Sequence, residues 1–223
     1  NRIYKTTDAG ENWLLSNTSF PAVAYQDAVI FDDIKFADAN TGYLLANNGR
    51  VYKSTDGGDN WLLQTNVPEF VKDKTMSSLS VTSIDTVYAS GWAGTVMKTT
   101  DGGTNWVMAN NGLPSLYTNY MKVLMYDNNQ GMVFGNGSVF TTKDGGNNWS
   151  VYYAPVQDGF AAACFAPVNG CSPESICKKV FAGSFFTGKI LKFDADRVLP
   201  VKFSKLTGTR SSAGNQLFFT AFT

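Results

Sequence analysis

The sequence contains no histidine among its 223 residues. Without histidine, the Ser-His-Asp and Cys-His nucleophile pairs cannot form, and a metal site with His ligands cannot form either. This single absence excludes most common hydrolases. It leaves carboxylate-based enzymes, binding modules and structural proteins as the classes to consider.

Cysteine is scarce, and its three copies are clustered. Cys164, Cys171 and Cys177 lie within the segment CFAPVNGCSPESIC. In an exported protein, Cys171 and Cys177 could close a short disulfide loop, and three reduced thiols are the alternative. Three cysteines without histidine fall short of the usual four ligands of a structural zinc site. We therefore expect no metal here.

An excess of charge and a long apolar run are also missing. The 18 basic and 18 acidic residues cancel, so we expect no nucleic-acid partner. No apolar run approaches the roughly 18 residues of a membrane span, and the opening stretch NRIYKTTDAG lacks the apolar core of a signal peptide. We expect no membrane span and no export signal within this chain. With 43% hydrophobic and 14% aromatic residues, the chain can bury a core.

The most informative feature that is present is a short motif in four copies. The copies are IYKTTDAGENW (3–13), VYKSTDGGDNW (51–61), VMKTTDGGTNW (96–106) and VFTTKDGGNNW (139–149). They recur at intervals of roughly 45 residues, a period that includes four-stranded propeller blades. Each copy therefore indicates one structural unit.

Each unit reads as short strands separated by turn residues, without a sustained helical period. In the second unit, we expect strands at 31–39, 42–48, 50–56 and 61–66. The third and fourth units repeat this plan over 76–112 and 120–155. Four strands per unit predict an all-β protein, a β-propeller.

The motif lies between the third and fourth strands of each unit, which predicts a turn. The Asp56 side chain can accept hydrogen bonds from backbone N–H groups of its own turn, and Gly58 can adopt a conformation that a side chain would hinder. The tryptophan that follows can bury its ring against the blade. These structural positions are Asp8, Trp13, Asp56, Trp61, Asp101, Trp106, Asp144 and Trp149.

The pattern of Ser or Thr, then Asp, Gly and Trp resembles the Asp box, or bacterial neuraminidase repeat. Families with this box include sialidases, xyloglucanase-type glycosidases, sortilin-like receptors and photosystem II assembly factor-like propellers. The sequence pattern TTDGG.NW is most similar to that of the last group, whose members in non-photosynthetic bacteria are mostly exported. The resemblance covers about residues 1–155.

Strands at both ends extend this plan. Two strands precede the second unit and about three follow the fourth, so we expect about four to five blades. A small closed ring is one arrangement; part of a larger propeller is the one we favour. We expect the propeller domain to span 1–198. Residues 199–223 would form a linker and the start of a β-sandwich-like segment, because LPVKF resembles the post-propeller segment of type IX secretion cargo; a closing strand with a tail is the alternative.

Three chemical alternatives to a structural role are weak. A calcium loop at Asp56, Asp59 and Asn60 is disfavoured, because the other copies replace Asp59 with Glu11, Thr104 or Asn147. A sialidase would need three converging arginines. A glycosidase needs two carboxylates facing each other across a cleft, and nothing in the sequence fixes the separation of the candidates. The arginines are Arg2, Arg50, Arg197 and Arg210, and the candidate carboxylates are Asp32, Asp33 and Glu69.

The remaining class is a binding module. Aromatic side chains on loops opposite the Asp boxes suit recognition of a sugar or a protein, because they present rigid area at low entropy cost. Packing between neighbouring blades is the alternative role for each. We therefore expect a non-enzymatic, secreted or cell-surface bacterial scaffold that binds a glycan or protein without a cofactor; the alternative is a glycoside hydrolase whose catalytic residues lie partly outside this chain. The predicted binding residues are Trp92, Tyr117, Tyr120, Phe70 and Tyr25.

Overall fold

The computed structural model describes residues 2–18, 20, 29–114, 119–135, 137–153, 159–167, 178–184, 190–194, 206–211 and 214–219. These residues form antiparallel β-sheets and a single-turn 3-10 helix, η1 (Glu69–Val71). No helix in this part of the chain is long and apolar enough to cross a membrane. The prediction of an all-β protein is confirmed.

The second, third and fourth repeats each form a four-stranded sheet in which neighbouring strands follow chain order. The second blade consists of β3 (Phe31–Phe36), β4 (Gly42–Ala46), β5 (Val51–Ser54) and β6 (Leu62–Leu63). The third consists of β7 (Met76–Val81), β8 (Val87–Gly91), β9 (Val96–Thr99) and β10 (Val107–Met108). The fourth consists of β11 (Tyr120–Met125), β12 (Gly131–Gly135), β13 (Ser138–Thr142) and β14 (Ser150–Tyr153).

Smaller sheets flank these three blades. The first blade is the pair β1 (Tyr4–Lys5) and β2 (Leu14–Leu15). The fifth is the three-stranded sheet β15 (Phe160–Pro167), β16 (Lys178–Ser184) and β17 (Ile190–Asp194). Within the tail, β18 (Leu206–Ser211) pairs with β19 (Gly214–Phe219) as an antiparallel hairpin. The predicted domain boundary at residue 198 lies outside the described residues.

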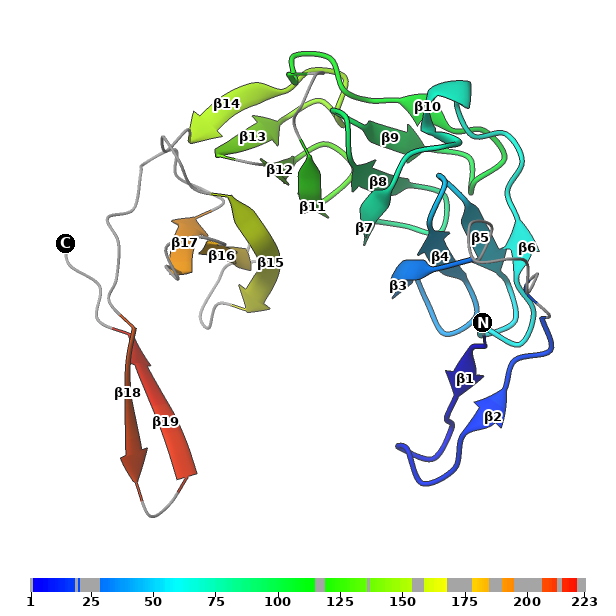
Figure 1. Cartoon of the computed structure of the whole chain (residues 1–223), viewed down its shortest axis with the longest axis horizontal. Helices are drawn as coiled ribbons and strands as arrows, with labels where there is room; N and C mark the ends of the chain where they lie inside the picture. Colours follow the sequence, from blue (N-terminus) through cyan, green and yellow to red (C-terminus); the bar gives the residue numbers. More distant parts are fainter. Residues whose placement is uncertain are drawn as a thin grey trace.

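The blades follow one another around an arc, with β3, β7, β11 and β15 nearest its centre (Figure 1). Neighbouring inner strands contact each other from blade to blade. The second strands β4, β8 and β12 are buried along their whole length, because the adjoining blades cover both faces of each sheet. This stacking is the packing expected of a propeller.

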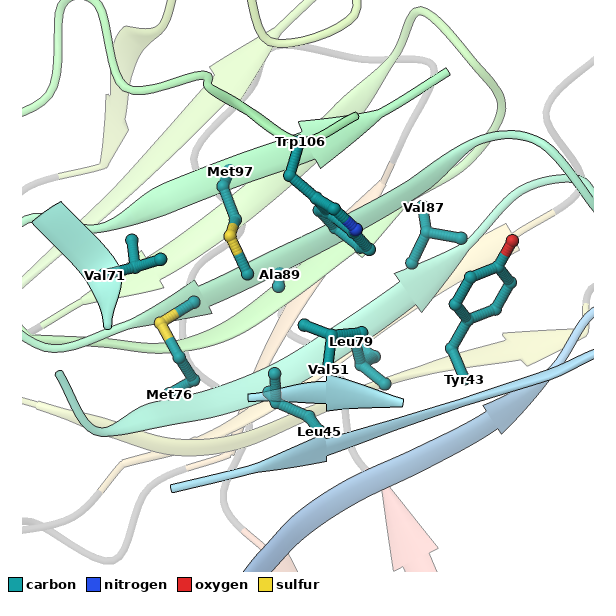
Figure 2. Packing of buried hydrophobic residues seen from close by; sticks show 10 residues of the cluster. All are labelled: Tyr43, Leu45, Val51, Val71, Met76, Leu79, Val87, Ala89, Met97 and Trp106. Carbon is teal, nitrogen blue, oxygen red and sulfur yellow. The ribbon is translucent and has the colours of Figure 1, made fainter. Parts of the chain in front are cut away.

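The core lies between blades. Figure 2 shows one such cluster, in which Tyr43, Leu45 and Val51 of the second blade pack against side chains of the third. The partners from the third blade and its entry loop are Val71, Met76, Leu79, Val87, Ala89, Met97 and Trp106. Because each blade buries its faces only against its neighbours, the stability of one blade depends on the next.

Each inner strand is irregular near its start. Between β3 and β4 the register shifts after Phe31, and equivalent shifts follow Met76 in β7, Tyr120 in β11 and Phe160 in β15. A β-bulge of this kind adds one residue to one strand and redirects the side chains beside it. In β3 the added residue is Asp32, the first of two adjacent carboxylates.

Candidate functional site

Each Asp box is a closed turn. In the third blade, the Thr99 hydroxyl donates to Asp101 Oδ1 (2.8 Å) and accepts the N–H of Gly103 (2.9 Å). Asp101 Oδ1 also accepts the backbone N–H of Asn105 (2.9 Å), and Oδ2 accepts its side-chain amide (2.8 Å). The other three boxes make the same bonds. Both oxygens of each carboxylate are engaged inside the turn.

These bonds hold the box carboxylates as anions. The Thr6 hydroxyl and the Asn12 amides lower the pKa of Asp8 to about 2. The Asn60 backbone and side-chain N–H groups likewise lower the pKa of Asp56 to about 2. Hydrogen bonds that favour the charged form have this effect. The neighbouring Asp59 pairs with Lys5 at 2.5 Å, so the second carboxylate of the calcium alternative points to the first blade.

The box tryptophans differ in burial. Trp61, Trp106 and Trp149 are each 4% exposed, whereas Trp13 is 60% exposed. Trp61 Nε1 donates to the Gly58 carbonyl (3.0 Å) and Trp149 Nε1 to the Ala109 carbonyl of the preceding blade (2.8 Å). Trp13 belongs to the two-stranded first blade, which offers less surface to cover its ring.

The Asp boxes lie at one end of the blades, and the loops that were predicted to carry the binding residues lie at the other. In the second, third and fourth blades the box joins the third and fourth strands, and its first glycine donates to the turn between the first and second strands, as Gly102 N–H does to the Asp85 carbonyl (3.0 Å). The opposite end carries the β4–β5, β6–β7 and β8–β9 loops. Gly49 N–H donates to the Lys74 carbonyl (3.0 Å), and Trp92 N–H donates to the Thr75 carbonyl (2.9 Å). These bonds tie the three loops into one surface, which we call the loop face.

A cationic pocket opens on the loop face. It has a volume of about 290 Å³ and includes Arg50, Gln64 and Lys72 in its lining. The Arg50 Nη1 nitrogen is buried and donates no hydrogen bond. An unpaired buried guanidinium nitrogen is costly. A carboxylate can pair with a guanidinium through two parallel N–H···O bonds, one from each of two nitrogens. The pocket therefore has the chemistry of a carboxylate site. The remaining lining residues are Asn48, Gly49, Leu63, Thr65 and Val67.

Two of the predicted aromatic residues lie on this face. Phe70 is in η1, 51% exposed, and its ring lies 5.3 Å from Lys74 Nζ. Trp92 follows β8 and is 48% exposed. Lys72, which lines the cationic pocket, pairs with Glu69 beside Phe70. Rigid aromatic area next to a charged pocket suits a peptide better than a small ion.

The other predicted aromatic residues are not placed on this surface. Tyr120 belongs to the core: it is fully buried in β11, its ring packs edge-on to Phe140, and its hydroxyl donates to the Pro114 carbonyl (3.1 Å). The alternative of packing between blades therefore describes Tyr120. Tyr25 and Tyr117 lie outside the described residues, as do Cys171 and Cys177, while Cys164 in β15 is an exposed free thiol.

A second charged group lines the centre of the arc. Asp33 pairs with Lys35 (3.0 Å) and, across two blades, with Lys122 (3.5 Å). Asp33 Oδ2 also accepts the N–H of Leu79 in the intervening strand β7 (2.9 Å). One carboxylate thus links the three inner strands β3, β7 and β11. The sequence did not indicate this role, because Leu79 and Lys122 lie 46 and 89 positions away from Asp33.

The two adjacent carboxylates titrate in opposite directions. Asp32 is exposed, yet partial desolvation and then the charge of Asp33 raise its pKa to about 6. Burial also acts to raise the pKa of Asp33, but the Leu79 N–H and the two lysines outweigh it and lower that pKa. Asp33 is therefore an anion committed to the scaffold. Glu69, the third candidate carboxylate, lies in η1 on the loop face.

Comparison with known proteins agrees with this architecture. A family profile described as photosynthesis system II assembly factor YCF48 matches residues 15–163, in accord with the resemblance drawn from the repeats. No curated protein matches the chain significantly.

Solved structures with a similar fold are propellers. A structure of YCF48 bound to a D1 peptide has 20% identity and a TM-score of 0.59, and the match covers 86% of this chain and 60% of that one. YCF48 from Cyanidioschyzon merolae has 18% identity and a TM-score of 0.59, with 76% and 54% covered. An ancestral GH74 enzyme has 15% identity and a TM-score of 0.57, with 98% and 35% covered. This chain thus spans less than two thirds of the length of each.

Proposed function

The chain belongs to the family of photosynthesis system II assembly factor YCF48, and from this premise we propose that it is a non-enzymatic propeller that binds a segment of a partner protein on its loop face. The observation that carries the proposal is the buried, unpaired Arg50 Nη1 in the cationic pocket. YCF48 has been solved with a bound D1 peptide, which makes a peptide the ligand class to test first.

The recognised group on the partner is a carboxylate, either a C-terminus or an acidic side chain. Arg50 supplies a planar fork of donors, and Lys72 adds a second positive charge. The flanking Phe70 and Trp92 would pack against apolar residues of the same segment. The three loops are tied by backbone bonds, so little ordering is required on binding.

A glycosidase is the weaker candidate. Such an enzyme needs an acid and a nucleophile or base on either side of a bound sugar. Asp33 is held by two lysines and a backbone N–H, which leaves Asp32 as the one carboxylate of that pair with a raised pKa. Hydrolysis of a chromogenic xyloglucan oligosaccharide at an ordinary enzymatic rate would overturn the scaffold function.

The proposal also covers where the protein acts and whether its ligand is a glycan. We propose that the protein acts outside the cell or on its surface, which is supported by the resemblance to exported Asp-box propellers and of the tail to type IX cargo. Fractionation of the source bacterium with protease treatment of intact cells tests this. Protein that stays protected until the cells are lysed would contradict it. Binding on a glycan array that survives Arg50→Gln would favour a glycan over a peptide.

The direct test is a peptide selection on the purified chain. Short random peptides with free C-termini are selected on the wild type, and the dissociation constant is measured by fluorescence anisotropy. We expect binders to carry a carboxylate, and Arg50→Gln to weaken them about tenfold or more. Lys143→Gln, at an exposed lysine in the opposite, box-bearing end, serves as the matched control. Selected peptides that bind both variants equally would refute the site.

A further inference from the structure

The sequence has four Asn–Gly steps, and the structure describes both residues of two of them, Asn48–Gly49 and Asn111–Gly112. The second step follows β10, where the chain leaves the third blade for the fourth. We propose that Asn111 is a site of spontaneous deamidation, at which water converts the side-chain amide to a carboxylate. The product weakens a contact between these two blades. The inference goes beyond the proposed function and uses none of the residues of the loop-face pocket.

The reaction requires an accessible backbone nitrogen directly after the asparagine. The Gly112 nitrogen loses its proton and attacks Asn111 Cγ, the bond from Cγ to Nδ2 breaks, and ammonia leaves. Water then opens the resulting five-membered succinimide at one of its two carbonyls, which yields aspartate or isoaspartate. A glycine in the second position favours ring closure, because it has no Cβ beside the attacking nitrogen and its backbone rotates easily.

Both reacting groups are accessible in the folded chain. Asn111 and Gly112 are exposed, and they occupy the centre of a turn in which the Leu113 N–H donates to the Asn110 carbonyl (3.0 Å). Within the part of the chain that the structure describes, the Gly112 N–H donates no hydrogen bond. Its nitrogen is therefore available once the Asn111 side chain rotates toward it.

The Asn48–Gly49 step provides a contrast within the same molecule. Gly49 is buried, and its N–H donates to the Lys74 carbonyl (3.0 Å). A Cβ built on Gly49 would lie 2.1 Å from the Val71 carbonyl oxygen, so the entry loop of the third blade covers this glycine. The fold therefore protects Asn48 and leaves Asn111 open to reaction.

The second blade has an asparagine in the same place with a different residue after it. Asn66 is exposed, like Asn111. Its carbonyl accepts the Trp106 N–H (3.0 Å), as the Asn111 carbonyl accepts the Trp149 N–H (2.9 Å). Asn66 is followed by Val67, whose branched Cβ obstructs ring closure. Asn66 is therefore a matched internal control.

The Asn111 side chain joins the third blade to the Asp box of the fourth. Its Nδ2 donates to Asn148 Oδ1 (2.7 Å), and Asn148 Nδ2 donates to Asp144 Oδ2 (2.8 Å). The second bond fixes the orientation of the Asn148 amide, so a carboxylate at position 111 places an oxygen against an oxygen. Deamidation thus replaces a hydrogen bond between blades with a repulsive contact.

The glycine itself is required by the fold. Gly112 has a φ of +83°, and a Cβ built on it would lie 2.3 Å from the Trp149 carbonyl oxygen. The backbone conformation and the fourth blade therefore both exclude a side chain at this position. The same close approach leaves little space for the extra methylene that isoaspartate adds to the chain before Gly112.

The test compares deamidation rates within one sample. The purified full chain is incubated at mildly alkaline pH and digested, and conversion at each asparagine is followed by tandem mass spectrometry. We expect Asn111 to convert about tenfold or more faster than Asn66 and Asn48. In urea, Asn48 should approach the rate of Asn111, because the fold no longer protects it. Asn111 no faster than Asn66, or Asn48 as fast as Asn111 in the folded chain, would overturn the site.

Variants test the consequence for the blade interface. Asn111→Asp should lower the melting temperature by about 1–3 °C, because it removes the donor to Asn148 and adds a charge. Aged wild type should show the same loss in proportion to its conversion. Asn111→Gln should remain unconverted and keep its melting temperature over the same incubation. Unchanged melting of wild type in which Asn111 has converted would overturn the weakened contact.

Discussion

At the scale of single residues, the four box carboxylates are held as anions by the N–H and O–H groups of their own turns. The pKa of Asp56 lies at about 2 in the folded chain, against a usual value of 3.8. Because the folded pKa is lowered, its contribution to stability is complete above about pH 4 and is lost as the pH falls toward 2.

This predicts a characteristic acid profile for Asp56→Asn. The difference in urea midpoint between wild type and variant should be large at pH 6 and should shrink steadily below pH 4, because protonation then removes the same bonds in the wild type. Asp73→Asn, at an exposed carboxylate outside the boxes, is the control. A difference that stays constant down to pH 2 would contradict the assignment.

Asp32 should behave in the opposite way. Its folded pKa of about 6 lies above 3.8, so ionisation destabilises the fold as the pH rises through this window. Asp32→Asn should raise the melting temperature at pH 7.5, on the order of 2 °C, and should leave it unchanged at pH 4. Thermal unfolding at the two pH values measures this; a loss of stability at pH 7.5 would show that Asp32 has a partner.

Residue roles were predictable where the sequence repeats them. The Asp and Gly of each box were expected in a turn, and Gly58, Gly103 and Gly146 do adopt φ values of +92°, +89° and +76°. The Asn directly before each Trp donates to both oxygens of the box carboxylate, and its presence in all four copies is the sequence signal for this role. Arg50 could not be assigned, because its pocket forms only where loops distant in sequence meet.

At the scale of elements, the positions of the strands could be predicted from the sequence. Whether an individual aromatic side chain is buried or exposed could not. Expected strands at 31–39 and 42–48 correspond to Phe31–Phe36 and Gly42–Ala46. Tyr120 was expected to present its ring on the loop face, but as the first residue of β11 it faces inward and is fully buried. One residue of shift reverses the face of a strand side chain, and composition does not fix that register.

The blade elements predict unequal roles for tryptophans that are equivalent in sequence. Trp106→Ala removes a buried ring from a blade interface and should lower the free energy of unfolding by about 3–5 kcal/mol. Trp13→Ala removes a ring that is 60% exposed and should cost well under half as much. Urea denaturation of the two variants measures this. Equal losses would contradict the link between the burial of each ring and its contribution to stability.

At the scale of the whole molecule, the chain is an arc of blades (Figure 1). Two kinds of side-chain contact join the blades to one another. Tyr43 and Tyr88 each hydrogen-bond to the next blade, and Asp33 contacts the inner strands β7 and β11 from its place in β3. The sequence predicted the blades from their period. These contacts between blades could not be predicted, because each connects residues about 40 or more positions apart, as the hydrogen bond from Tyr43 to Ile84 shows.

The central claim is a division of labour: the boxes build the fold, and the opposite loop face binds the partner. Thr99→Val removes a buried box hydroxyl and should lower the free energy of unfolding by about 1–3 kcal/mol without touching the loop face. Arg50→Gln removes an unpaired buried donor and should leave stability nearly unchanged.

The most direct measurement is therefore one anisotropy titration of a selected carboxylate peptide against both folded variants, with their melting temperatures recorded on the same samples. The account predicts that Thr99→Val melts earlier but keeps its dissociation constant within about twofold, while Arg50→Gln keeps its melting temperature and binds about tenfold or more weakly. Unchanged binding by Arg50→Gln, or loss of binding by folded Thr99→Val, would contradict it.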